Sequence, residues 1–406
     1  MTVVDLLAVP SVLIAETDPW TRDLLKQVVL SVRCDAQLDV CGEGQQASVL
    51  LSKKAYDLVI AARDLPGIGG LELLRALRQR RAAPVLPFIL LSERNDSASV
   101  REALPLAPTA YLTTPLDIGG LTKRLQGLLL NAGQAVLCNV PTLAPGMTLK
   151  RFLEDHRGSS DGAPLWVNVQ LAVKRSLLPA GLDLALLEQA VCADPQITAV
   201  LIAAANSAAQ HRVSPVQTLA QALQRLGAAQ SMNLALGLTL KPGAQLSDPC
   251  LANYAEHYWT ISLRAAKYGR ALAGMLNLDQ ERCYCAGLLH RLGDLALLRS
   301  LQDWQQAGGE LDTQAIEASL LEFAAAYGSA LRTRWRLPLE LRELIAAIYH
   351  LGGGVYSREA LVMNLVAQMA NLPPEEGIDA LANSKTARLL KIGAPELSRL
   401  IADPAL

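Results

Sequence analysis

The chain has 406 residues, enough for two or three domains of about 100 to 200 residues each. Its formal net charge is -1, without a long run of one sign, which argues against broad nonspecific attraction to nucleic acid or anionic lipid. Hydrophobic residues make up 51% of the chain and charged residues only 18%, so the composition excludes a largely disordered protein and favours large helical cores.

The seven cysteines are odd in number and include no C-x-x-C pair, so we expect buried thiols in a reducing cytoplasm. The first twenty residues have no basic leader, and Asp5 and Pro10 interrupt their apolar residues. We therefore expect neither a signal peptide nor a membrane span, which needs about 20 uninterrupted apolar residues.

The N-terminal third alternates short apolar runs with helical patterns. Four runs predict strands, namely SVLIA (11–15), DLVIAA (57–62), PFILLS (87–92) and AYLTT (110–114). Asp18 and Pro19 predict a helix start, with a capping side chain followed by proline in the first turn. Apolar strands that alternate with helices predict a parallel sheet covered on both faces, with function at the carboxyl ends of its strands.

Over residues 10–130 these segments resemble the receiver domain of two-component response regulators. The resemblance is carried by VLIAETDP, YDLVIAARDLPGIGGLELLRALR, FILLS and AYLTTPLD, in that order. It implies a doubly wound α/β domain with a five-stranded parallel sheet. It also implies Mg²⁺-binding acids after the first strand, and a phosphoryl-accepting Asp at the end of the third. A Ser or Thr after the fourth strand and a Lys after the fifth would read the phosphorylated state.

The sequence departs from this pattern at the positions that would bind Mg²⁺ and accept the phosphoryl group. Glu16 and Thr17 stand where a pair of acids is expected, which leaves Glu16 with Asp18 as the next acid. Ala62 falls at the acceptor position, and a methyl group cannot take a phosphoryl group. Half of the acid pair is a poor ligand set for Mg²⁺, which prefers several oxygen ligands.

The positions that would read the phosphorylated state are also incomplete. Ser92 matches the hydroxyl position, but Thr114 replaces the Lys. Asp64, two residues beyond Ala62, is open as a substitute acceptor, although we favour a solvated or capping role for it. We predict a pseudo-receiver domain that keeps the fold, has lost the switch chemistry and serves as a docking or dimerisation surface.

After residue 130 the alternation stops. Residues 131–164 mix Gly, Pro, Asn and Thr and predict a linker with a short helix at Met147 to His156. Residues 165–406 predict an all-helical region, with a core over about 165–352 and a C-terminal extension over 353–406. A single helical domain and two helical subdomains fit this region equally well.

Two boundaries in this region are specific expectations. One helix should start at Ser214-Pro215 and end at Gly227. Another should run without a break through DQERCYCAGLLHRLGDLALLRSL (279–301).

Several phrases together resemble the HDOD domain, a non-catalytic relative of the HD phosphohydrolases. The resemblance covers most of residues 165–352 and rests on ordered phrases that include GLLHRLGDLAL and YGSALRTRWRLP. Asn206 is expected to end a helix with its side chain bonded to the backbone. The signature residues that we assign to structure are Asp194, Pro195, Asn206, Ser207, Trp335 and Pro338.

HD enzymes bind divalent metal with histidines and an adjacent His-Asp pair, and this set is degraded here. His290 is retained, but Arg291 replaces the Asp, and a guanidinium cannot ligate a cation. Ile261 and Ala324 occupy two further His positions, and His350 is unpaired. We therefore predict no metal site and no cofactor.

Two neighbouring residues bear on this interpretation. His257, one turn before Ile261, is an alternative ligand, although an ordinary helix residue fits its setting better. Asp294 is three residues from Arg291, so we predict an ion pair between them.

The combined pattern predicts a non-enzymatic cytoplasmic adaptor in signal transduction, with a phosphorylation-independent receiver. Its partners should be other signalling proteins, not nucleic acid or membrane, and a homodimer remains open. The alternative is a divergent HD-type phosphohydrolase, or a module that senses a nucleotide messenger at His290 and Arg291, because arginine pairs well with phosphate oxygens.

Overall fold

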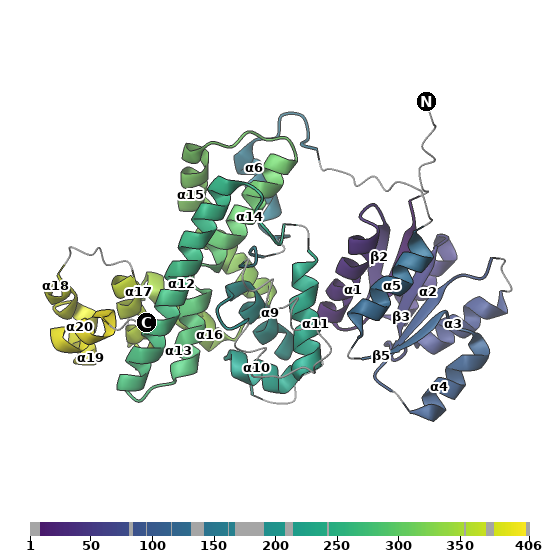
Figure 1. Cartoon of the computed structure of the whole chain (residues 1–406), viewed down its shortest axis with the longest axis horizontal. Coiled ribbons are helices and arrows are strands. Elements are labelled where there is room, and N and C mark those ends of the chain that lie inside the picture. The colour runs from purple at the N-terminus through teal and green to yellow at the C-terminus, as the bar shows by residue number, and fades with distance from the viewer. Residues whose placement is uncertain are drawn as a thin grey trace. The chain divides into compact units, whose positions relative to one another are not determined.

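The computed structural model describes residues 9–80, 84–94, 96–114, 116–130, 142–160, 162–166, 191–207, 214–241, 243–352, 355–370 and 377–402. Its contacts divide the chain into two compact units: residues 1–140 with 229–241, and residues 141–228 with 242–406. The first holds the sheet and the second is helical (Figure 1). Among the residues that the structure describes, every helix is too short or too polar to span a bilayer.

The first unit is a five-stranded parallel sheet flanked by helices. Its strands are β1 (Ser11–Ala15), β2 (Gln37–Cys41), β3 (Leu58–Ala62), β4 (Phe88–Ser92) and β5 (Ala110–Thr113), in the order β2-β1-β3-β4-β5. Each neighbouring pair is parallel. The predicted fold class of this region is confirmed.

Helices cover both faces of the sheet because its central strands are apolar on both sides. The helices are α1 (Pro19–Val32), α2 (Gly44–Lys53), α3 (Gly70–Gln79), α4 (Ser97–Ala103), the short 3₁₀ turn η1 (Leu104–Leu106) and α5 (Ile118–Leu129). α1 packs with α5, and α2 packs with α3. Leu13, Val59 and Leu90 share one cluster with Ala47 of α2 and Leu74 of α3. Alternation along each strand therefore places every second residue against the opposite helices.

One helix from later in the chain belongs to the first unit. α11 (Ala228–Thr239) lies within the region expected to be part of the helical domain, yet residues 229–241 group with the sheet. Asn233 Nδ2 donates to Leu116 O at 2.9 Å, and Lys241 Nζ pairs with Asp23 Oδ2 at 2.6 Å. The contacts of the first unit are thus not confined to residues 10–130.

The second unit is built from helices throughout its described part. They are α6 (Leu149–His156), α9 (Pro195–Ala205), α10 (Leu219–Leu226), α12 (Pro249–Met275), α13 (Gln280–Leu289), α14 (Leu292–Gln306), α15 (Thr313–Arg334), α16 (Leu339–Tyr349), α17 (Arg358–Ala370), α18 (Ile378–Ala382), α19 (Lys385–Leu390) and α20 (Ala394–Ala402). The predicted all-helical class of this region is confirmed. The sequence also predicts a helix over LDLALLEQAVCADP (182–195), which falls largely outside the described residues.

The first boundary expectation is confirmed at its end, because Gly227 is the C-cap of α10, but it was wrong at its start, and the second expectation was wrong. The helix expected from Ser214-Pro215 begins at Leu219, because Thr218 caps it by accepting the N–H of Gln221. The helix expected over 279–301 is broken: α13 ends at Leu289, His290 is its C-cap, and Arg291 is the N-cap of α14.

A glycine lies on either side of this break, at a close helix crossing. A Cβ on Gly287 would lie 2.7 Å from backbone atoms of Ala265, and one on Gly293 would lie 2.2 Å from Ala324 O. α13 therefore approaches α12 closely, and α14 approaches α15 closely, on either side of His290. Such contacts with backbone on both sides require glycine.

The cysteines differ in part from the expectation of thiols throughout. Cys41, Cys192, Cys250, Cys283 and Cys285 are free, but Cys34 forms a disulfide. The expectation was therefore wrong for Cys34, because an odd count and irregular spacing say nothing about which cysteines the fold brings together.

Candidate functional site

The first place to inspect is the carboxyl edge of the sheet, where receiver chemistry would take place. The acids after β1 are engaged in local structure. Glu16 Oε1 accepts the backbone N–H of Asp18 at 2.9 Å, and burial raises the pKa of Glu16 above its ordinary value. Asp18 caps α1, since Oδ2 accepts both the N–H and the hydroxyl of Thr21 at 2.8 Å. Thr17 is exposed and contributes no carboxylate.

The end of β3 carries a cation next to the position of the missing acceptor. Ala62 ends the strand and the side chain of the next residue, Arg63, is only 8% exposed. Arg63 Nη1 donates to Ser99 O at 3.0 Å, and Nη2 pairs with the carboxylate of Glu102. Because Ser99 and Glu102 both belong to α4, Arg63 ties the end of β3 to that helix.

Sequence reasoning missed Arg63. The residue directly after an acceptor position is a visible place to look, but a single Arg in a loop does not reveal that its side chain is buried. Its two partners lie 36 and 39 residues further along the chain.

The remaining residues of this edge also have local partners. Asp64 forms an exposed ion pair with Arg94 at 3.4 Å. Ser92 Oγ accepts the N–H of Arg94 at 3.0 Å. Thr114 is half-buried, and its N–H donates to Ser92 O at 2.9 Å.

These residues do not fit a Mg²⁺ ion and a phosphoryl group. Carboxylate oxygens of Glu16 and Asp18 accept hydrogen bonds from nearby backbone N–H groups. Ala62 has no side-chain oxygen, and the neighbouring Arg63 carries a permanent positive charge. Within the described ranges, no group of three or more His, Cys, Asp and Glu side chains is arranged to hold a metal ion.

The second place to inspect is the break between α13 and α14 in the helical unit. His290 is 3% exposed, and its Nδ1 donates to Gly287 O at 2.6 Å. Burial lowers the pKa of His290 from 6.5 to about 4, so the ring is neutral at pH 7. The Tyr349 hydroxyl donates to His290 O at 2.5 Å.

Arg291, at the position of a metal ligand in HD enzymes, forms the predicted ion pair with Asp294. Its Nη1 lies 3.2 Å from Asp294 Oδ1, and its guanidinium carbon lies 5.4 Å from the centre of the Tyr258 ring. Asp294 is 6% exposed, and this burial raises the pKa of its carboxyl above the ordinary value in spite of the neighbouring cation. The pair is thus more buried than an ordinary surface pair.

The other former ligand positions are not assembled into a site. Ile261 is buried in α12, and Ala324 presents its backbone oxygen to Gly293. His350, the C-cap of α16, is exposed. His257 is exposed as well, beside Tyr258 at 5.7 Å between ring centres. These residues do not fit a divalent metal, because only His290 and Asp294 combine a ligating group with burial at the break.

The signature residues hold helix ends. Asp194 is the N-cap of α9, accepts the N–H groups of Ile197 and Trp166 at 2.9 Å, and is followed by Pro195 in the first turn. Asn206 ends α9, as expected, and its side chain exchanges two hydrogen bonds with the backbone of Val216.

The remaining signature residues have similar positions. Ser207 N donates to Ala204 O at the end of α9, Trp335 is the C-cap of α15, and Pro338 is the N-cap of α16.

Comparison with protein families finds one match in the N-terminal region and another in the helical region. The response regulator receiver domain matches residues 12–126, and the HDOD domain matches residues 163–351. The chain therefore contains a response regulator receiver domain followed by an HDOD domain. This fusion is typical of a signalling protein.

Curated relatives match the receiver domain. The phosphate regulon transcriptional regulatory protein PhoB of Rhizobium meliloti is 32% identical over 101 residues, which are 25% of this chain and 44% of PhoB. The regulatory protein VanRB of Enterococcus faecalis is 30% identical over 122 residues, which are 30% of this chain and 53% of VanRB. The chain thus spans about half of the length of these relatives.

Parts of the chain are also similar to solved structures. The MmoQ response regulator of Methylococcus capsulatus is 21% identical, with a TM-score of 0.46, covering 60% of this chain and 99% of that chain. The signal receiver domain of an HD domain-containing protein from Pseudomonas fluorescens is 27% identical, with a TM-score of 0.28, covering 30% of this chain and 95% of that chain.

Proposed function

We propose that the protein is a non-enzymatic cytoplasmic adaptor in signal transduction, which acts through contacts with other signalling proteins. Its receiver domain works without phosphorylation. The observation that carries this proposal is Ala62 at the acceptor position, with the buried guanidinium of Arg63 beside it. A side chain without an oxygen cannot accept a phosphoryl group, and Arg63 already connects β3 to α4 without one.

The helical domain supports the same proposal. The break at His290 and Arg291 is occupied by hydrogen bonds, an ion pair and close helix crossings. His290 and Arg291 therefore have contacts within the protein that stabilise the turn without a metal. We propose domain limits of 10–130 for the pseudo-receiver, 131–164 for the linker and 165–406 for the HDOD-like region.

Titration with beryllofluoride and Mg²⁺ tests the receiver part. Trp20 lies two residues after Asp18, so its fluorescence reports on the acids that follow β1. We expect no saturable change. Saturable quenching that disappears in Glu16→Ala and Asp18→Ala would contradict the proposal, since it would show that the acids bind the phosphoryl analogue.

One observation favours the alternative, a divergent phosphohydrolase or a sensor of a nucleotide messenger. Arg291 Nε is buried and has no hydrogen-bond partner. Arginine forks suit phosphate oxygens. Thermal-shift measurements with cyclic dinucleotides, nucleotides and (p)ppGpp test for such a ligand, and elemental analysis tests for bound metal. A reproducible shift that is lost in Arg291→Ala would replace the adaptor by this alternative.

A further inference from the structure

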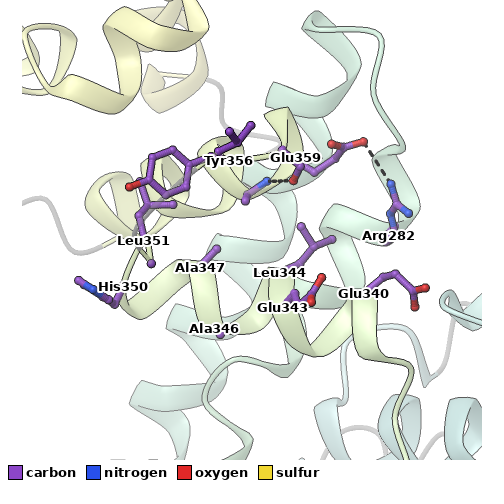
Figure 2. Close-up of a pocket in the computed structure, with 14 residues that line it drawn as sticks. Arg282, Glu340, Glu343, Leu344, Ala346, Ala347, His350, Leu351, Tyr356 and Glu359 are labelled. Carbon is purple, nitrogen blue, oxygen red and sulfur yellow. Dashed lines mark hydrogen bonds and ion pairs between the residues drawn. The ribbon is translucent and has the colours of Figure 1, made fainter.

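A groove in the helical unit lies apart from the break at His290 and Arg291 and shares only His350 with the former ligand positions. It lies along α16, between this helix, the start of α17 and Arg282 of α13, and has a volume of about 580 Å³ (Figure 2). His350 and Leu351, directly after α16, close one end of it. This volume lies within the range of about 300 to 1,000 Å³ that is typical of ligand pockets.

The floor of the groove is apolar. Leu344 and Ala347 of α16 are 5% and 6% exposed, and Leu351 and Ala360 are half-buried. Val355 at the rim is fully exposed, so it has no partner within the described part of the chain. An apolar side chain entering here would bury its own surface and the exposed surface of Leu351, Ala360 and Val355, at about 25 cal/mol for each Å².

The walls of the groove carry excess negative charge. Glu340 and Glu343 are exposed, lie three residues apart on α16 and make no ion pair in the described structure. Like charges at this spacing repel each other. Glu359 is different, because its Oε1 lies 3.1 Å from Arg282 Nη2 (Figure 2). Three carboxylates therefore face one guanidinium, which one of them already neutralises.

An aromatic ring on the other wall already contacts a cation. Lys385 Nζ of α19 lies 5.9 Å from the centre of the Tyr356 ring, a cation–π distance. A cation of this chain therefore already contacts the Tyr356 ring, and the attraction for a ligand's positive charge comes from Glu340 and Glu343.

From this charge complementarity we propose that the groove, defined by Glu340, Glu343, Leu344, Ala347 and Tyr356, binds a short linear segment of a partner protein in which an Arg or Lys stands next to an apolar residue. The basic group would pair with Glu340 and Glu343, and the apolar side chain would lie on Leu344 and Ala347. Two unneutralised carboxylates disfavour nucleotides and anionic lipid. The inference rests on the adaptor function and specifies the chemistry of its partner.

Selection from a random library of twelve-residue peptides displayed on phage tests this proposal with the full-length protein. We expect enriched peptides to carry Arg or Lys beside an apolar residue. Their affinity, measured by fluorescence anisotropy, should fall about tenfold or more in Glu340→Lys/Glu343→Lys, which corresponds to about 1.4 kcal/mol. All substituted residues are exposed, so the fold is kept, and circular dichroism checks this.

The matched control is Glu256→Lys/Glu310→Lys, which makes the same change in net charge at two exposed positions away from the groove. It should leave the affinity unchanged. Equal losses in both double variants, enrichment of acidic peptides, or failure to enrich any peptide would overturn the proposal. A dimer in sedimentation that only the groove variant abolishes would assign the groove to a second copy of the chain instead. None of these results bears on beryllofluoride binding, so failure here is distinct from failure of the adaptor proposal.

Discussion

At the scale of single residues, fixed positive charges stand at or next to the positions where each domain would have used a carboxylate. Arg63 follows the missing acceptor of the receiver, and Arg291 replaces the missing ligand of the HD site. Each guanidinium has its own carboxylate partner, Glu102 and Asp294 respectively. Because arginine remains charged at any working pH, the cation of each pair is permanent.

Arg63→Met should loosen α4. The substitution removes the hydrogen bond to Ser99 O and the pair with Glu102, and a charge-assisted hydrogen bond contributes about 1.5–3 kcal/mol. We expect faster amide hydrogen exchange in α4. The control is Arg94→Met, whose ion pair with Asp64 is exposed on both sides and contributes about 0–1 kcal/mol. Equal exchange in the two variants would show that Arg63 is not the tether.

Arg291→Asp restores the His-Asp pair in sequence but should not restore a metal site. Ile261 and Ala324 supply no ligand, so elemental analysis should find no stoichiometric transition metal. The substitution also sets a second carboxylate near buried Asp294, and we expect a loss of about 2 kcal/mol in the free energy of unfolding. Arg151→Asp, at an exposed ion pair with Asp155, should cost less. Stoichiometric zinc or manganese in Arg291→Asp would contradict this expectation.

His290 and Asp194 should give opposite pH dependences of stability. The pKa of His290 falls to about 4 through burial, so below pH 6.5 the unfolded chain takes up a proton that the folded chain refuses, and stability falls as pH falls. Burial raises the pKa of Asp194 to about 6, so between pH 4 and 6 the folded chain keeps a proton that the unfolded chain has lost. That contribution weakens as pH rises.

Urea denaturation between pH 4 and 6 separates the two groups. Relative to the unsubstituted protein, His290→Gln should become more stable as pH falls, and Asp194→Asn should become less stable. Each difference changes by at most about 1.4 kcal/mol per pH unit. Parallel curves for the two variants would disprove the assignment.

At the scale of elements, helix packing accounts for the two glycines in GLLHRLG. Gly287 and Gly293 stand on either side of His290, where α13 meets α12 and α14 meets α15. The side chains of His290 and Arg291 complete the turn between these crossings.

Gly293→Ala should destabilise the helical unit by about 1–3 kcal/mol, because the new Cβ would meet backbone atoms of α15 at 2.2 to 2.6 Å. Gly127→Ala is the control. Gly127 is exposed in α5 with no atom near a Cβ, so alanine there should stabilise its helix by about 0.5–1 kcal/mol. Urea denaturation followed by circular dichroism measures both changes. An unchanged free energy of unfolding in Gly293→Ala would show that the crossing between α14 and α15 can accommodate a Cβ.

The elements also show where sequence patterns are informative. β4 is buried throughout, and β1 and β3 are buried at all but one terminal residue, so their apolar runs predict them directly. β2 went unnoticed as a pattern, since its residues QLDVC are largely half-buried or exposed at the sheet edge. The break at His290 was missed because the periodicity of apolar residues continues across it, and only the facing helices require it.

At the scale of the whole molecule, the net charge of -1 bears on the class of partner. Protein–DNA affinity depends on neutralising several phosphates, and a chain with balanced charge offers little attraction. Fluorescence anisotropy with a labelled duplex of about 30 base pairs should therefore show no binding at physiological salt. Micromolar binding whose logarithm falls linearly with the logarithm of salt concentration would contradict this and would indicate a basic surface.

The sequence by itself determined the two folds and the losses in both sites. Apolar periodicity and ordered phrases depend on neighbours along the chain, and an alanine or an isoleucine cannot ligate or accept in any fold. Only the tertiary structure decided what replaced the lost chemistry: the contact of Arg63 with α4, the turn at His290 between two glycine crossings, and the acidic groove on α16. Each of these features depends on residues far apart in sequence. The pKa values and partners of the side chains involved depend on burial, and burial is a property of the folded chain.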